Sequence, residues 1–142
     1  MIALCAVGAA FVLGSLIAVL VETDEEAIER VTEECREAFL AGDADALIAR
    51  STTDATVSGL AGRGPLAESA REWVTRAGRR VAGATLSLRV IEVDGDDGRA
   101  EWLATVRMRD SEMVPFARLT VRIDYRRGPE GWRIRHVEIL PP

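Results

Sequence analysis

Apolar residues recur at helical spacing in the segment that follows residue 22. One face of this segment carries Ile28, Val31, Cys35 and Phe39, while glutamates at four-residue spacing occupy other positions. Thr23 and Glu26 have the spacing of a capping box, which is typical of a helix start. Gly42 is typical of a helix end. The pattern therefore predicts a helix that begins after Thr23 and ends before Gly42.

Two further helices and one strand are predicted before residue 84. Asp43 is placed to cap a short helix with the sequence ADALIAR, residues 44–50. Residues 54–60, DATVSGL, fit a strand, and Pro65 opens a third helix that runs to about residue 78. The apolar side of that third helix consists of Leu66, Ala70, Trp73 and Ala77.

From Ala84 onward the period of the apolar positions changes to two, which is the period of strands. Four strands are predicted, over residues 84–93, 99–109, 117–127 and 132–140. The segments DGDDG and RGPEG have turn composition, whereas DSEMVPF is a longer connection. We therefore expect an α+β domain, in which an antiparallel meander packs on about three helices.

The turns also predict a register for this sheet, with 94 opposite 98, 108 opposite 117 and 127 opposite 132. The rows across the sheet are then Glu92–Ala100–Tyr125–Ile134, Val90–Trp102–Ile123–His136, Leu88–Ala104–Val121–Glu138 and Leu86–Val106–Leu119–Leu140. This face is nearly all apolar, as a face packed on helices must be. A one-residue slip would destroy the pattern. The register thus places His136, the only histidine, and Glu138 on the inner face.

The opposite face of the predicted sheet is rich in arginine. Its arginines are Arg89, Arg107, Arg109, Arg118, Arg122, Arg126, Arg133 and Arg135, set against the acids Glu101 and Asp124. The eight positive and two negative charges give a local excess of six, although the whole chain has a net charge of −5. One interpretation is an ordinary solvated sheet face. The other is a contact with anionic lipid headgroups or with an acidic partner protein. The acidic balance of the chain argues against nucleic acid as the partner.

Residues 1–21 form an apolar run without a single charge. About 20 helical residues are needed to cross the hydrocarbon core of a bilayer, so the run predicts a single transmembrane anchor. A cleaved signal peptide is the alternative, but the run lacks a basic segment and exceeds the usual apolar length. We expect a domain boundary at residue 21, with the domain of residues 22–142 outside the cytoplasm. The predicted location is a bacterial inner membrane, with the globular part in the periplasm.

Two pieces of the chain resemble a known superfamily, the AGDADAL helix junction at residues 41–47 and the final strand GWRIRHVEI at residues 131–139. Together with the order of elements over residues 24–140, they resemble the nuclear transport factor 2-like superfamily, in particular its SnoaL-like and small uncharacterised bacterial members. The resemblance implies a curved sheet wrapped around helices as a cone with an apolar pocket. Superfamily members include isomerases, cyclases, dehydratases and epoxide hydrolases, but also transport factors and other non-catalytic domains. The fold alone does not choose among these functions.

The chemistry-bearing candidates are few. His136 is the candidate general acid or base, with Asp54 or Glu138 to orient it. The alternative is a histidine that is merely hydrogen-bonded within the fold. The best candidates for pocket walls are Phe39, Trp73, Trp102, Met108, Tyr125 and His136, several of which would equally serve as core. A lone histidine without spaced partners predicts no metal site, and no sequence motif calls for a cofactor.

The anchor and the arginine face together favour a membrane-anchored binding or interaction module, for example an accessory subunit of a larger membrane assembly. The alternative is a small pocket enzyme or hydrophobic-ligand binder of the SnoaL-like type. The sequence does not decide whether the chain is an enzyme, although the first helix lacks the tyrosine that the isomerase-like enzymes of the superfamily carry and has Phe39 on its inner face.

Overall fold

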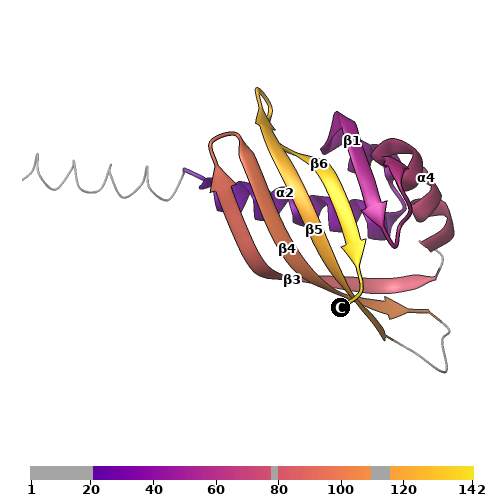
Figure 1. Ribbon diagram of the computed structural model, residues 1–142. Helices are drawn as coiled ribbons and strands as arrows, with labels where there is room; N and C mark the ends of the chain where they lie inside the picture. The colour runs from indigo at the N-terminus through magenta and orange to yellow at the C-terminus, as the bar shows by residue number, and fades with distance from the viewer. Residues whose placement is uncertain (1–20, 78–79, 110–115) are drawn as a thin grey trace, which may run out of the picture.

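The computed structural model describes residues 21–77, 80–109 and 116–142. Three helices and six strands follow one another along these residues (Figure 1). The elements are α2 (Asp24–Ala41), α3 (Ala44–Ala49), β1 (Ser51–Gly59), β2 (Gly64–Pro65), α4 (Leu66–Ala77), β3 (Val81–Asp94), β4 (Asp97–Met108), β5 (Phe116–Gly128) and β6 (Gly131–Leu140). The predicted α+β class is confirmed, as are the three helices and the four strands of the meander.

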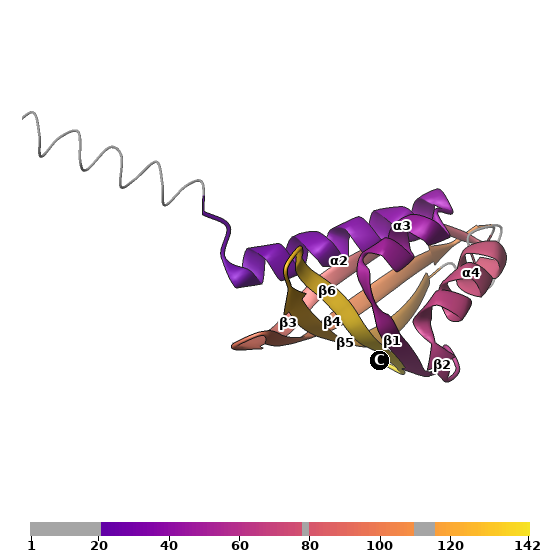
Figure 2. The ribbon, with the colours of Figure 1, turned by 90° about the horizontal axis from the view of Figure 1, so that it is seen from above.

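The six strands form one curved sheet in the order β2-β1-β6-β5-β4-β3. Strand β1 runs parallel to β6, and every other pair is antiparallel. Figure 2 shows α2 lying along one face of this sheet, with α3 and α4 on the same side. The sheet therefore has an inner face, covered by helices, and an outer face on which no helix of the described residues packs.

The ends of α2 and α3 follow the predicted capping chemistry. The Thr23 side chain accepts a hydrogen bond from the Glu26 amide, and the Glu26 carboxylate accepts one from the Thr23 amide. Gly42 ends α2 in the left-handed conformation, with φ of 74°. The Asp43 side chain then accepts a hydrogen bond from the Ala46 amide and so caps α3.

Helix α2 packs closely on the sheet because strand β4 has a glycine beneath it. A Cβ atom at Gly98 would lie 2.8 Å from Cδ1 of Ile28 and 3.3 Å from Cζ3 of Trp132. Ile28 is fully buried at this contact. Gly98 thus allows the helix to approach the sheet at a distance that any larger residue would prevent.

A chain of buried hydrogen bonds links α2 to the middle of the sheet. Nε1 of Trp102 donates to the Tyr125 hydroxyl at 3.2 Å, and that hydroxyl lies 2.6 Å from Oγ1 of Thr32. Thr32 donates its own proton to the Ile28 carbonyl at 2.8 Å, so the Tyr125 hydroxyl donates to Thr32. Burial raises the pKa of Tyr125, which therefore remains a neutral donor.

The predicted register is wrong in part, because strands β3 and β6 each contain an irregularity. Tyr125 lies opposite Ile134 as predicted, but the pairing then shifts, and His136 lies opposite Asp124. Val137 takes the inner position, so His136 and Glu138 lie on the outer face. An inserted residue reverses the alternation of a strand, and Arg135 is that residue here. The predicted inner positions of His136 and Glu138 are therefore corrected.

A second irregularity, between Leu88 and Val90, has the same effect in β3. Ile91 and Val93 pack against the core, while Glu92 is exposed on the outer face rather than in the predicted inner row. The hairpin is also tighter than predicted, with Asp94 opposite Asp97. Between β4 and β5 the pairing differs by two residues, which moves the rows but keeps each side chain on its predicted face.

The predicted anchor, residues 1–21, lies outside the described residues except for Val21. Within the part of the chain that the structure describes, no helix has the length and apolar character needed to cross a bilayer. The anchor therefore stays a prediction from the sequence.

Candidate functional site

An apolar cavity of about 310 Å³ lies between the three helices and the inner face of the sheet. Its walls come from α2, α3, α4, β3, β5 and β6, so all three helices and three of the six strands contribute to it. The lining residues are Thr32, Cys35, Arg36, Phe39, Leu47, Leu66, Trp73, Ala77, Leu86, Ile123, Ile134, Val137 and Ile139. A cavity of this size is at the lower end of the range for small-molecule sites.

Two of the six predicted wall residues, Phe39 and Trp73, line this cavity. Trp102 and Tyr125 are instead buried in the core beside it, where the hydrogen-bond chain to Thr32 holds them. Met108 pairs with Val81 at the end of β4 and does not line the cavity. His136 is separated from it by the sheet, because the strand irregularity turns its side chain outward.

The remaining wall residues were not distinguished by the sequence. Leu47, Leu66, Leu86 and Ile134 occupy apolar positions that a filled core would equally require. The available signal was the small size of Cys35 and Ala77 on helix faces otherwise occupied by Phe39 and Trp73. Small residues opposite large ones leave space only when no neighbouring side chain fills it. The pattern of residue types along the sequence does not show which side chains are neighbours in the fold.

Two polar side chains belong to the cavity wall besides Thr32. Burial raises the pKa of the Cys35 thiol to about 12, so it stays protonated and is a weak nucleophile at neutral pH. Arg36 lies at the rim, where its guanidinium donates to the Ala84 carbonyl at 3.0 Å and to the Glu33 carboxylate. The hydrogen bond to Arg36 lowers the pKa of Glu33 and raises that of Arg36.

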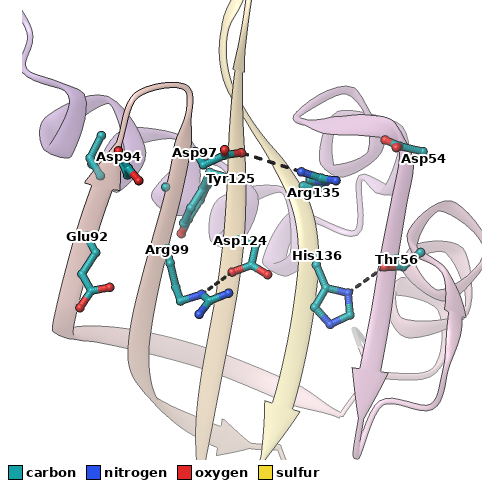
Figure 3. A pocket seen from close by; sticks show the side chains of 12 residues that line it. Asp54, Thr56, Glu92, Asp94, Asp97, Arg99, Asp124, Tyr125, Arg135 and His136 are labelled. Carbon is teal, nitrogen blue, oxygen red and sulfur yellow. Dashed lines mark hydrogen bonds and ion pairs between the residues drawn. The ribbon is translucent and has the colours of Figure 1, made fainter.

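The outer face of the sheet carries a separate, polar groove of about 960 Å³ (Figure 3). The sequence-predicted candidates Asp54 and His136 both line it, on the neighbouring strands β1 and β6. The ring of His136 is held by two hydroxyls of β1, Nδ1 lying 2.7 Å from Oγ1 of Thr56 and Nε2 lying 2.9 Å from Oγ of Ser58. No hydrogen bond among the described residues joins His136 to Asp54 or Glu138, the two predicted orienting groups.

The arginine face is less positive than the sequence predicted, because carboxylates interleave with the arginines. Arg122 pairs with Glu101 at 3.0 Å and with Glu138 at 3.6 Å, and Glu138 was expected on the inner face. The other ion pairs of predicted face residues are Arg126–Asp97, Arg135–Asp97, Arg133–Glu130, Arg89–Glu101 and Arg99–Asp124. Arg107, Arg109 and Arg118 form no ion pair with any described residue. The expected excess of six charges is therefore corrected.

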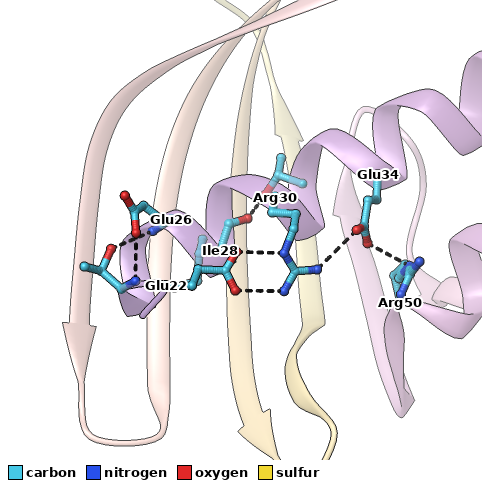
Figure 4. A network of polar contacts seen from close by, with 8 residues as sticks. Glu22, Glu26, Ile28, Arg30, Glu34 and Arg50 are labelled. Carbon is cyan, nitrogen blue, oxygen red and sulfur yellow. Dashed lines mark hydrogen bonds and ion pairs between the residues drawn. The ribbon is translucent and has the colours of Figure 1, made fainter. Parts of the chain in front are cut away.

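A line of ion pairs runs along the exposed side of α2 (Figure 4). Arg30 contacts Glu22 at 2.7 Å and Glu34 at 3.1 Å, and Glu34 in turn contacts Arg50 at 3.0 Å. These contacts connect Glu22, which precedes the α2 cap, to the helix, and they join α2 to Arg50, the residue that follows α3. Among the described residues there is no cluster of three or more histidine, cysteine or carboxylate groups suited to a metal ion.

Solved structures with this fold come from several bacteria. A nuclear transport factor 2-like superfamily protein of Salmonella enterica is 20% identical, with a TM-score of 0.67 over 84% of this chain and 91% of its own. A protein described as a putative aromatic ring hydroxylase, from Novosphingobium aromaticivorans, is 19% identical, with a TM-score of 0.64 over 82% of this chain and 87% of its own. At these identities the likeness shows the fold alone. A comparison with curated proteins found no match.

Another match covers almost the whole of a solved chain. A nuclear transport factor 2-like protein of Shewanella oneidensis is 10% identical, with a TM-score of 0.69, and the match covers 82% of this chain and 98% of the other. That protein consists of little besides this domain. In the present chain, the buried hydrophobic core of the described residues lies within residues 28–137, so the domain of residues 22–142 contains all of it.

The predicted resemblance to the nuclear transport factor 2-like superfamily is thus confirmed at the level of the fold. The family model described as a SnoaL-like domain matches residues 22–138, which is most of the chain, and the chain belongs to the SnoaL-like domain family.

Proposed function

We propose that this chain is a membrane-anchored binding module whose SnoaL-like domain holds a small apolar ligand. The observation that carries the proposal is the cavity of about 310 Å³, which is walled by aromatic and aliphatic side chains such as Phe39, Trp73 and Leu86. Transfer of an apolar molecule from water into such a space is favourable in proportion to the area that it buries.

Binding fits this cavity better than catalysis does. Proton transfer needs a group whose pKa lies near the working pH. Among the described wall residues there is no carboxylate and no histidine. The Cys35 thiol, with a pKa of about 12, and the permanently charged Arg36 do not exchange protons readily at neutral pH. The cavity can therefore hold an apolar ligand, but its described wall residues offer little to transform one.

The experiment that tests the proposal is calorimetric titration of the domain of residues 22–142 with 1-octanol. A ligand of this size in an apolar cavity should bind with a Kd below about 1 mM. Saturation-transfer NMR on the same samples reports the contact independently of heat. Absence of both signals at millimolar 1-octanol would refute the proposed function.

The membrane part of the proposal is supported by the uncharged run of residues 1–21. The α2 cap begins only two residues later, and Glu22 between them is fixed to Arg30 at 2.7 Å, which leaves no flexible linker. We expect the full chain to stay in the membrane fraction after carbonate extraction and the domain outside the cytoplasm, while residues 22–142 alone are soluble. Release of the full chain by carbonate would argue for a cleaved or peripheral segment instead.

The arginine face remains part of the proposal as the contact with an acidic partner protein or with anionic headgroups. Arg107 and Arg118, which form no ion pair with any described residue, are now its best candidates. Reversal of both charges to glutamate should reduce retention of the full chain in its membrane complex. The matched control is reversal of both Arg126 and Arg135 to glutamate, since Asp97 already pairs with these two arginines. Equal retention of both variants would remove the arginine face from the proposal.

A second candidate function is proton transfer by His136 in the outer groove. It is favoured by the 2.9 Å contact between Nε2 of His136 and Oγ of Ser58, the arrangement of a base beside a hydroxyl. If this function is correct, a substrate that the wild type turns over should no longer be turned over by a folded His136→Gln variant. Turnover that survives the substitution would exclude it, and the binding of 1-octanol would be unaffected in either case.

A further inference from the structure

Arg36 lies where the apolar cavity meets the solvent. Because the cavity surface is almost wholly apolar, the Arg36 side chain lines the wall chiefly through carbon atoms, and the side chain as a whole is 23% exposed. The guanidinium bridges α2 and β3, because NH1 donates to the Ala84 carbonyl at 3.0 Å. Its other edge faces Glu33, with Nε donating at 2.8 Å and NH2 donating to the second carboxylate oxygen. The cation is therefore fixed at the rim rather than free in solution.

The guanidinium retains capacity for another partner. It has five N–H donors in a planar fork, and the contacts above use three of them. Two donors remain, one on each terminal nitrogen, if each contact uses one hydrogen. A carboxylate accepts two such hydrogen bonds in one plane, and charge-assisted hydrogen bonds are stronger than neutral ones. A neutral hydroxyl would satisfy the donors less well.

We propose that the ligand is an amphiphile whose carboxylate lies against Arg36 while its apolar body fills the cavity beside Phe39 and Trp73. This inference rests on the proposed function. The cavity of about 310 Å³ sets the size. At about 30 Å³ per water-sized group, it holds roughly ten non-hydrogen atoms. A medium-chain fatty acid or a small aromatic acid has this size and this polarity.

Glu33 has a defined role in this arrangement. The Glu33 carboxylate already occupies one edge of the Arg36 guanidinium. It therefore weakens the attraction of Arg36 for a second anion, because it repels that anion directly and partly neutralises the positive charge of Arg36. Its own side chain is half exposed, at 51%. Removal of its charge should therefore strengthen the binding of an anionic ligand, whereas it should leave a neutral ligand of the same length unaffected.

Octanoate and 1-octanol test the inference, since they share an eight-carbon chain and differ in the head group. Both are titrated at pH 7 into the domain of residues 22–142, which contains the whole buried core of the described residues. We expect the wild type to bind octanoate about tenfold more tightly than 1-octanol. In Arg36→Gln this preference should vanish while 1-octanol still binds. In Glu33→Gln it should increase several-fold.

Arg30→Gln is the matched control, because Arg30 is another ion-paired arginine of α2 but does not line the cavity. It removes the same charge and should leave the preference unchanged. Equal affinity of the wild type for the two probes would overturn the inference and leave the proposed function intact. Failure of both probes to bind would overturn both. If Arg36→Gln does not fold, as judged by circular dichroism, an unchanged preference in Glu33→Gln overturns the inference.

Discussion

Substitution of Ala77 by phenylalanine should fill the cavity, and so separate a binding site from a packing defect. Ala77 is the last residue of α4 and lines the cavity together with Trp73 of the preceding turn. An aromatic ring at this position would extend into the cavity, whose volume of about 310 Å³ exceeds that of the ring. If the space serves a ligand, the substitution should improve stability and abolish binding together.

The magnitude follows from the area that the ring buries. A phenylalanine buries at least about 150 Å². If about 100 Å² of this is newly buried in the cavity, the gain is about 2.5 kcal/mol at 25 cal/mol per Å². Fixing the side chain in one rotamer costs about 0.5–1 kcal/mol. The free energy of unfolding should therefore rise by about 1–2 kcal/mol, which lies within the range that cavity-filling substitutions commonly give. The ring takes most of the roughly ten atom positions, so the affinity for 1-octanol should fall at least about tenfold.

Urea unfolding measures the first quantity and calorimetric titration the second. Ala67→Phe is the matched control, since it makes the same change on the same helix at a residue that does not line the cavity. It should leave 1-octanol binding unchanged. Undiminished binding in Ala77→Phe would show that the ligand lies elsewhere, and a loss of stability would show that the space is too small for the ring.

Three further predictions concern the sheet and the thiol. His136→Ala should lower stability by about 1–2 kcal/mol, because Thr56 and Ser58 lose their shared partner, without changing 1-octanol binding on the other face; altered binding would move the ligand site to the outer groove. Gly98→Ala should cost about 1–3 kcal/mol in urea unfolding, whereas Gly128→Ala, with nothing within 4 Å, should stay within about 0.5 kcal/mol; equal costs would contradict the close approach of α2. The raised pKa of Cys35, about 12, means that the folded state holds this proton more tightly than the unfolded state. Stability should therefore fall as pH rises from about 8.5 towards the folded value, and Cys35→Ala should lessen that fall; identical pH profiles would contradict the assignment.

The helices were predictable because the signals that define them are local. The side chains of Thr23 and Glu26 contact each other's backbone, and Gly42 contacts the carbonyls of Ala38 and Phe39. Because these contacts join residues within one helical turn, the spacing in the sequence is enough to predict where the helix begins and ends. Five of the six strands were predictable as strands for the same reason, but β2 was not, because Pro65 was expected to open the third helix. Their registers were not, because a register depends on contacts between distant segments and on inserted residues such as Arg135.

The final strand shows what signal was missed. Trp132 and Ile134 are two residues apart, but the next buried side chain is Val137, three residues on. Strict alternation places His136 inside, where it would need hydrogen-bond partners within an apolar layer. A strand with one inserted residue places Val137 inside and lets His136 meet two hydroxyls of β1. The second arrangement buries more apolar surface and satisfies the ring, and both effects favour it.

The same reversal divides the chemistry of the molecule between the two faces of the sheet. The outer face has His136, Asp124 and Glu138, and water reaches the groove around them. The inner face has the cavity, where burial keeps Cys35 protonated and leaves Arg36 as the charged side chain at the rim. The proposed ligand would therefore meet an almost wholly apolar surface, and the described wall residues include no carboxylate or histidine. The proposed proton transfer by His136 lies on the other side of the sheet, so substitutions on one face should leave the activity of the other unchanged.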